Sequence, residues 1–296
     1  MPACVFRVNK QGVKRRSEFN GGCTGSVAKL NGNKSRERLS LFRHLILKQT
    51  KMASNLNNKT VLVTGSTSGL GKQLALELTK SGGPKVIVHG KDQQKAAALI
   101  KELDKINPKV KHQGIVCDFN QPSTIVKAFG QIKKLDILIN NAGVWAEGNT
   151  IAIKPSRIIE LVNVNLLSYL MTSSILLPIL LKSEFAQILN VISVAGYEVP
   201  TEYYHTIYSA TKYDLQGFTE AMAKEFDNKK LRVMGYYPGG MDTELFTKAG
   251  MDYKQHEPWM FNPIESVEAI IFMLTRNPKV NIKRMDLINH LQISPS

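Results

Sequence analysis

Two side chains four residues apart, Tyr208 and Lys212, have the types and the spacing needed to move a proton. On a helix, residues four apart lie on one face, one turn from each other, so the pair places an ammonium group beside a phenol. A phenol with its ordinary pKa of about 10 is a poor base at neutral pH. A neighbouring cation favours the phenolate and lowers the phenol pKa, so we predict a proton-transfer group tuned toward neutral pH.

A glycine-rich turn lies upstream of this pair, between a short apolar run at 60–64 and an amphipathic stretch that begins at Gly69. Glycines let the backbone approach a pyrophosphate closely, and a helix N-terminus offers unpaired N–H groups with a partial positive charge. We predict that the turn binds a dinucleotide, with a ligand-free glycine turn as the alternative. Its predicted contacts are Gly65, Ser66, Ser68, Gly69, Leu70 and Gly71.

The residues after the second predicted strand, 85–89, indicate which dinucleotide binds. An acidic side chain here would bind the 2′-hydroxyl of NAD, but the chain continues with Gly90 and Lys91, and the first acid is Asp92. Gly90 leaves room, and Lys91 can pair with a 2′-phosphate as a point charge, helped by Ser66. We predict NADP(H) as the cofactor; a solvated surface lysine is the alternative.

Asp118 follows the third predicted strand, 115–117. Its carboxylate could accept a hydrogen bond from the adenine amino group of a bound dinucleotide. It could equally cap the helix that follows. Both interpretations remain open from the residues alone.

Apolar runs and amphipathic stretches alternate from residue 58 onward. Strands are predicted at 60–64, 85–89, 115–117, 135–139, 187–192, 231–236 and 282–288. Helices are predicted at 69–81, 91–106, 122–132, 155–181, 207–227 and 263–275. This alternation is typical of right-handed βαβ units. The predicted fold class is α/β: one doubly wound parallel sheet, with helices on both faces, over residues 58–290.

The order and spacing of the motifs resemble those of the short-chain dehydrogenase/reductase family over about residues 58–290, which implies a Rossmann-type domain. The matching positions are the TGxxxGxG run at 64–71, Asp118, the NNAG turn at 140–143, Asn165, Ser193, Tyr208, Lys212 and the PGGMDT run at 238–243.

The resemblance implies a role for each catalytic residue. Tyr208 is implied to be the acid in carbonyl reduction and the base in alcohol oxidation, with Ser193 bonded to the substrate oxygen. Lys212 is implied to lower the tyrosine pKa and bind the nicotinamide ribose, and Asn165 to position a water. Taken singly, Ser193 could cap a turn and Asn165 could satisfy backbone groups. Further implied cofactor contacts are Asn140, Ala142, Gly143, Tyr208, Lys212, Pro238, Gly239 and Thr243.

The sequence departs from the family pattern in two places. Fifteen residues separate Ser193 from Tyr208, slightly more than the family leads us to expect, and the extra length falls around 198–206. The C-terminus lacks the glycine-rich ending of many tetrameric members. A homodimer is therefore the assembly we consider.

The predicted reaction is hydride transfer between NADP(H) and a carbonyl or alcohol substrate. An apolar loop predicts a hydrophobic ketone or aldehyde, although the same residues could cover the domain's own core or a subunit interface. Two rival functions remain: an NADPH-binding regulator without turnover, and a family epimerase or dehydratase. The loop residues are Leu245, Phe246, Met251, Tyr253, Trp259, Met260 and Phe261, with Tyr197, Glu198 and Tyr203 as the opposite wall.

Charge is concentrated in a leader, residues 1–51, which holds 12 Lys and Arg against 2 acidic residues, a net charge of +10. The other 245 residues hold 27 basic and 22 acidic residues, a net charge of +5, which does not favour a nucleic-acid partner. The leader is interpreted as a disordered tail, a targeting segment or an upstream extension of the gene model. We expect a cytoplasmic protein if Met52 is the true start, and a mitochondrial or plastid one if the leader is a presequence.

Neither a metal site nor a membrane span is expected. The three cysteines, Cys4, Cys23 and Cys117, have no CxxC spacing, so they predict neither a disulfide framework nor a zinc site. The longest apolar run, around 175–181, falls short of the roughly 18 residues of a span.

Overall fold

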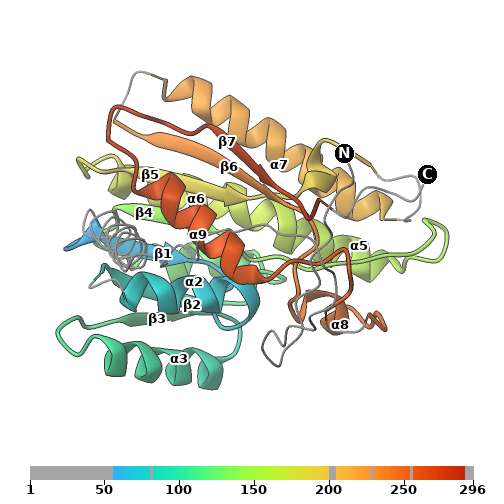
Figure 1. Ribbon diagram of the computed structural model, residues 1–296, viewed down its shortest axis with the longest axis horizontal. Coiled ribbons are helices and arrows are strands. Elements are labelled where there is room, and N and C mark those ends of the chain that lie inside the picture. Colours follow the sequence, from blue (N-terminus) through green and yellow to red (C-terminus); the bar gives the residue numbers. More distant parts are fainter. Residues whose placement is uncertain (1–55, 81–82, 200–204, 228–229, 254–255, 291–296) are drawn as a thin grey trace, which may run out of the picture. The chain divides into compact units, whose positions relative to one another are not determined.

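A seven-stranded parallel sheet forms the centre of the molecule, in the order β3-β2-β1-β4-β5-β6-β7 (Figure 1). The computed structural model describes residues 56–80, 83–199, 205–227, 230–253 and 256–290; the predicted leader, 1–51, and Tyr203 lie outside them. Every adjacent pair of these strands is parallel, so the predicted doubly wound sheet is confirmed. The strands are β1 (Thr60–Val63), β2 (Lys85–Gly90), β3 (Gln113–Val116), β4 (Ile137–Asn140), β5 (Gln187–Val191), β6 (Arg232–Pro238) and β7 (Arg284–Leu287).

Helices cover both faces of this sheet. Alternate residues of a strand point to opposite faces: Val61 and Val63 pack with α2, α3 and α9, whereas Leu62 packs on the side of α4, α6 and α7. The helices are α2 (Gly69–Lys80), α3 (Gln93–Ile106), α4 (Ser123–Phe129), α5 (Pro155–Val162), α6 (Ser168–Leu180), α7 (Thr206–Glu225), α8 (Leu245–Lys248) and α9 (Pro263–Leu274).

The strand order reverses between β1 and β4, because β1 pairs with β2 on one side and with β4 on the other. In doubly wound sheets, ligands bind at such a switch point, beyond the carboxyl ends of the strands. The glycine-rich turn follows β1 and the NNAG turn follows β4, so the topology brings them to this edge.

The predicted helix over 155–181 is present but is not one regular α-helix. A π-helical turn, Asn163–Leu167, separates α5 from α6. The whole run, Pro155–Leu180, is long and apolar enough to cross a membrane by length and composition, with a third of its apolar window buried. The helix presents Tyr169, Leu176 and Leu180 to the protein interior, as a core helix of a sheet protein also does.

Candidate active site

The glycine-rich turn lies at the carboxyl end of β1 and leads into α2. Gly65 and Gly69 have φ angles of +64° and +52°, in the left-handed region that favours glycine. A Cβ atom on Gly65 would lie 2.8 Å from Ala142 Cα, and one on Gly71 would lie 2.5 Å from Asn141 Nδ2. Glycine at these positions therefore lets the turn pack directly against the loop after β4.

The N-terminus of α2 suits an anionic group. Among the described residues of its first turn none is acidic, so nothing there neutralises the partial positive charge of the helix end. Leu70 buries its side chain in the core beneath the turn. Thr243, from the loop after β6, lies beside the turn, with its Cβ 3.8 Å from the position that a Cβ on Gly69 would take. Two predicted cofactor segments thus share one edge, which fits a dinucleotide pyrophosphate.

Ser66 and His89 hold the turn to the end of β2. Ser66 is fully buried, and its Oγ accepts a hydrogen bond from His89 N at 2.9 Å and donates one to His89 O at 3.3 Å. These bonds engage the Ser66 hydroxyl inside the protein, so the structure corrects its predicted role: Ser66 shapes the turn and does not present its hydroxyl to a 2′-phosphate.

The imidazole of His89 is a second brace for the turn. Its Nδ1 lies 3.1 Å from Gly65 N and its Nε2 lies 3.2 Å from Cys117 O. Nδ1 must therefore accept a hydrogen bond while Nε2–H donates one, which requires the neutral ring. Burial lowers the pKa of His89 to about 4, so the ring stays neutral at physiological pH. His89 connects the carboxyl ends of β1, β2 and β3.

Replacing His89 with phenylalanine is expected to weaken NADPH binding by about 10-fold. The variant keeps a ring to stack on Phe119, but leaves Gly65 N–H without its acceptor, at a cost of about 1 to 3 kcal/mol. Nucleotide fluorescence titration would measure the affinity. His112→Phe is the matched control, because His112 Nδ1 also accepts from a backbone N–H, Val86 N at 3.1 Å, at the other end of β2. Equal loss of affinity in both variants would contradict the role of His89.

The ribose end of the predicted site contains an exposed cation. Lys91 is exposed at the end of β2, while Asp92 caps α3 through bonds to Gln94 N and Lys95 N. Gly90 does not leave an open space as predicted: a Cβ there would lie 2.6 Å from Thr67.

Asp118 does not cap the following helix, which removes one of its two interpretations. Its Oδ1 accepts from Asn120 N at 2.9 Å, and α4 begins later, after Pro122, without a side-chain cap. The adenine contact remains a prediction.

Ser193, Tyr208 and Lys212 lie together at the same edge of the sheet. Ser193 lies two residues after the end of β5, and its side chain is close enough to the Tyr208 phenol to lower the phenol pKa. The Lys212 ammonium lies 5.6 Å from the centre of the Tyr208 ring and donates to Val191 O at 3.3 Å. All three side chains are buried. The spacing predicted from the sequence therefore brings a phenol, a hydroxyl and an ammonium into one cluster.

The pKa of Tyr208 is shifted opposite to the direction predicted from the sequence. Burial raises the pKa of Tyr208 to about 12, although Ser193 acts to lower it. Burial also lowers the pKa of Lys212 to about 7. A low-dielectric environment disfavours the charged form of each group. In the protein alone, the neutral phenol is thus the strongly favoured form, which suits a proton donor.

Asn165 sits in the π-helical turn and holds the loop after β4. Its Oδ1 accepts from Val144 N at 2.8 Å, and its Nδ2 donates to Val144 O at 2.9 Å. The side chain is fully buried, and a Cβ on Gly143 would lie 3.6 Å from its Oδ1. The structure therefore shows Asn165 satisfying backbone groups, in the loop next to Gly143 rather than in its own helix.

Asn140 and Ala142 are engaged in similar buried bonds. Asn140 Nδ2 lies 2.9 Å from Asn190 Oδ1, and its Oδ1 accepts from Thr172 at 2.8 Å. Ala142 O accepts from the Tyr169 phenol at 2.9 Å. The side chain of Asn140 therefore ties β4 to its neighbours and does not line an open trough.

Comparison with known proteins agrees with this geometry. Residues 59–254 match the short chain dehydrogenase family. The chain belongs to this family. An NADP-dependent 3-hydroxy acid dehydrogenase of Schizosaccharomyces pombe is 31% identical over 242 residues, which cover 77% of this chain and 92% of the relative. An uncharacterized oxidoreductase of Staphylococcus aureus is 28% identical over 230 residues, 78% of this chain and 96% of the relative.

Solved structures of the same fold include two complexes with nucleotides. An alcohol dehydrogenase from Thermococcus sibiricus, complexed with 5-hydroxy-NADP, aligns with a TM-score of 0.72 at 19% identity, over 81% of this chain and all of the other. A short-chain dehydrogenase from Sphingobium yanoikuyae, in complex with NADPH, aligns with a TM-score of 0.69 at 24% identity, over 79% of this chain and 89% of the other.

An aromatic mouth, Trp145 with His205, Phe246, Tyr253 and Trp259, covers Tyr208. The Trp145 ring lies 4.4 Å from that of Tyr208 and 5.1 Å from that of Phe246. Phe246 continues the mouth to Tyr253 and Trp259, at 5.5 and 5.4 Å.

The predicted apolar loop thus reaches Tyr208, but Tyr197, from its predicted opposite wall, packs elsewhere, and Tyr203 of that wall lies outside the described residues. Tyr197 packs at 5.8 Å against Tyr237, on β6, and under the Arg284 guanidinium. Glu198 is exposed. Trp145, which the sequence reasoning missed, takes the position facing Phe246; its only sequence signal is its place two residues after the NNAG turn.

The remaining predicted contacts lie at the expected edge. Pro238 ends β6 as a buried residue, and Gly239 N donates to Leu287 O at 2.8 Å. Within the described residues, no group of three or more His, Cys, Asp and Glu could hold a metal ion.

Proposed function

We propose that this chain is an NADP(H)-dependent oxidoreductase that transfers a hydride between the nicotinamide and a carbonyl or alcohol substrate. The observation that carries the proposal is the cluster of three buried side chains, Ser193, Tyr208 and Lys212, with the Lys212 ammonium 5.6 Å from the centre of the Tyr208 ring. Family membership and the NADP-dependent relative support it. The cofactor, when bound, supplies the hydride, and the protein supplies orientation and a proton.

The residues present fit a dinucleotide. The turn at Gly65, Gly69 and Gly71, with the N-terminus of α2, would hold the pyrophosphate. Lys212 would contact the nicotinamide ribose, and Thr243 would cover the nicotinamide.

In carbonyl reduction, the Tyr208 phenol donates its proton to the substrate oxygen. Ser193 donates a second hydrogen bond to that oxygen and stabilises the charge that develops on it. An anionic or polar partner beside Lys212 raises the pKa of its ammonium, which burial has lowered. The charged Lys212 then stabilises the phenolate that forms when Tyr208 gives up its proton. Asn165 fixes the loop that carries Trp145 over the reacting tyrosine.

Lys91 is proposed to select NADP(H) over NAD(H) through the 2′-phosphate. Lys91→Glu is expected to weaken NADPH binding by at least about 10-fold, because it replaces attraction by repulsion at the phosphate, while NADH binding changes little. Fluorescence titration with both nucleotides measures the preference. Lys101→Glu, at an exposed site further along α3, makes the same charge change as a control. An unchanged NADPH/NADH ratio in Lys91→Glu would exclude this role.

The substrate is proposed to be a hydrophobic ketone or aldehyde, because aromatic rings surround Tyr208. Its relative in Schizosaccharomyces pombe acts on 3-hydroxy acids by name, and a carboxylate would need a cationic partner. Arg157 is the cation bonded to the mouth, but it is already engaged with Trp145 O and Glu160. Apolar contacts therefore favour the uncharged substrate.

The test is NADPH consumption at 340 nm with a carbonyl panel that includes apolar ketones, aldehydes and a 3-oxo acid. The proposal predicts turnover, fastest with apolar ketones or aldehydes. NADPH binding without turnover across the panel would favour the regulator. A stereochemical inversion without net nucleotide oxidation would favour an epimerase, and loss of water without it would favour a dehydratase.

Two further expectations remain proposals. A homodimer is supported by exposed apolar residues on α5, Ile159 and Val162, and light scattering measures the mass. Localisation in the cytoplasm or in an organelle depends on residues 1–51, and sequencing the N-terminus of the native protein would decide whether Met52 is the start.

A further inference from the structure

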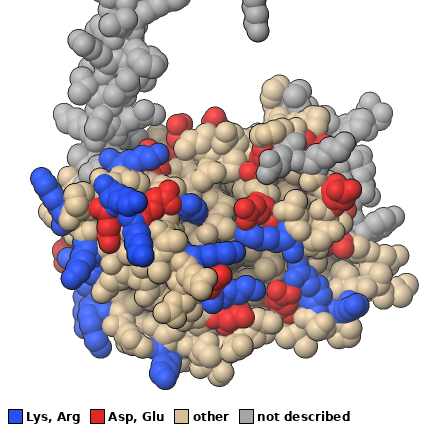
Figure 2. Space-filling model, turned by 90° about the horizontal axis from the view of Figure 1, so that it is seen from below, with Lys and Arg blue, Asp and Glu red and all other residues tan. Residues whose placement is uncertain are grey.

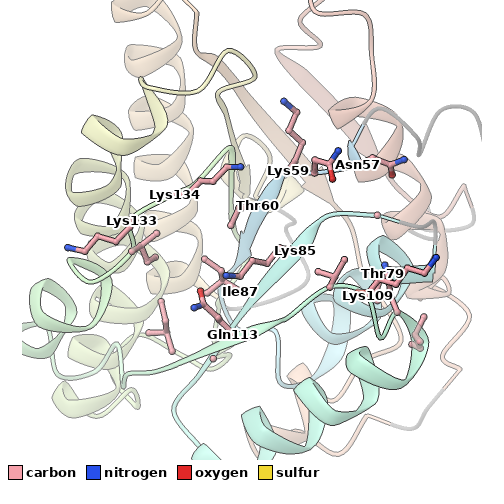
Figure 3. Close-up of a pocket in the computed structure, with 18 of the residues that line it drawn as sticks. Asn57, Lys59, Thr60, Thr79, Lys85, Ile87, Lys109, Gln113, Lys133 and Lys134 are labelled. Atoms are coloured by element: carbon pink, nitrogen blue, oxygen red, sulfur yellow. The ribbon is translucent and has the colours of Figure 1, made fainter.

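A cavity of about 1280 Å³ lies at the end of the sheet opposite to the active site. It is lined by the first residues of β1, β2 and β3, by the ends of α2 and α3, and by the loop after α4 (Figure 3). Tyr208 and the glycine-rich turn lie at the carboxyl ends of these strands, so the cavity belongs to neither the cofactor site nor the aromatic mouth.

Lysine dominates the charge of this cavity. Its described lining contains six lysines and neither aspartate nor glutamate. Figure 3 shows Lys85 beside Ile87 and Gln113, and the other labelled lysines on separate segments around them, with Lys59 and Lys133 extending outward. In Figure 2, lysine and arginine side chains gather at the left of the view, the end at which the strands of Figure 1 begin. The six are Lys59, Lys80, Lys85, Lys109, Lys133 and Lys134.

Ordinary structural roles account for only two of these lysines. Lys80 lies in the last turn of α2, where the helix dipole favours a cation, and pairs with Glu77 at 3.2 Å. The Lys59 ammonium lies 5.0 Å from the centre of the Phe185 ring. The other four lie on loops or at a strand start, and among the described residues none of them forms an ion pair.

Such a cluster has an energetic cost that an anion would offset. Like charges around one cavity repel each other and destabilise the folded chain. Residues 1–51 carry a net charge of +10, so the same repulsion disfavours them as the occupant.

The residue types suit a ligand with several negative charges close together. The cations that line the cavity are all lysines, which bind phosphate as point charges, and clustered phosphates can pair with more than one of them. Between the lysines, Ile87, Ile115 and Ile132 form an apolar floor, and Asn57 and Gln113 offer amides. We propose that this cavity is a second binding site, for a compact ligand that carries clustered phosphate groups.

Calorimetric titration of the full chain with inorganic tripolyphosphate, at roughly 50 mM salt, tests the proposal. We expect saturable binding that weakens at least about 10-fold in the triple variant Lys85→Gln, Lys133→Gln, Lys134→Gln. The control triple Lys101→Gln, Lys154→Gln, Lys224→Gln removes the same charge from other exposed positions. It should bind within about twofold of the wild type.

Affinity for NADPH, measured in parallel, separates this site from the proposed cofactor site. The cavity triple should keep its NADPH affinity, and Lys91→Glu should keep its tripolyphosphate affinity. Three results would each overturn the proposal: no binding by the wild type, equal weakening in both triple variants, or loss of tripolyphosphate binding in Lys91→Glu. The first excludes a site, the second shows unspecific charge attraction, and the third places the anion at the glycine-rich turn.

Discussion

Tyr208→Phe is expected to lower kcat by about 1000-fold while leaving NADPH affinity within about twofold of the wild type. The substitution removes only the phenolic oxygen, whose pKa Ser193 acts to lower, and keeps the ring that packs at 4.4 Å against Trp145. The mouth and the glycine-rich turn therefore remain in place, and the proton donor alone is lost. Steady-state rates with the best carbonyl of the panel, and a nucleotide titration, measure the two quantities.

Tyr213→Phe supplies the matched control for this experiment. Tyr213 is on the same helix, one turn from Ser209, and its ring is 43% exposed, so its hydroxyl serves no reacting group. We expect wild-type kinetics. If Tyr208→Phe retained more than about a tenth of the wild-type kcat, another group would have to donate the proton and the assigned chemistry would be wrong.

Lys212→Met is expected to abolish activity and yet to raise the melting temperature of the cofactor-free protein by about 5 °C. Burial lowers the pKa of Lys212 to about 7, which means that holding its charge inside the fold has a cost, on the order of 5 kcal/mol at most. Methionine fills similar space without that charge. Val191 O, which loses the ammonium, keeps the Tyr169 phenol at 3.1 Å.

The effect of Lys212 on stability has a defined pH dependence. The folded pKa of about 7 lies below the unfolded value of about 10.4, so between these values the unfolded chain binds more protons and the free energy of unfolding rises with pH. The gain in Lys212→Met should therefore be largest at or below pH 7 and shrink toward pH 9.5. Thermal unfolding across this range measures it, with Lys224→Met, exposed on the same helix, as the control. If Lys212→Met were less stable than the wild type and the difference did not change with pH, the claim that the buried charge of Lys212 destabilises the fold would be wrong.

Much of the fold was predictable because local signals agreed with one another. Apolar runs such as 60–64 became buried strands, and Gly82 and Pro84 marked the end of the first helix correctly, since α2 ends at Lys80. The reversal of strand order at β1 then placed the glycine-rich turn beside the NNAG turn, and four-residue spacing placed Lys212 beside Tyr208.

The features that sequence reasoning missed depend on contacts between distant segments. The sequence indicated only that His89 ends a strand. Its ring bonds to Gly65 and Cys117, and no local sequence pattern predicts these two contacts. Trp145 lies over Tyr208 because the loop after β4 packs against α7. These two segments are far apart in the sequence. The direction of the Tyr208 pKa was misjudged because charge proximity was weighed without burial, and burial is a property of the whole fold.

The most direct test of the central claim follows deuterium from the C4 position of labelled NADPH into the product of the best carbonyl substrate. The account predicts that mass spectrometry finds one deuterium on the carbinol carbon with the wild-type protein, and that Tyr208→Phe forms this product about 1000-fold more slowly. A wild-type protein that binds NADPH but yields no labelled alcohol from any carbonyl of the panel would contradict it.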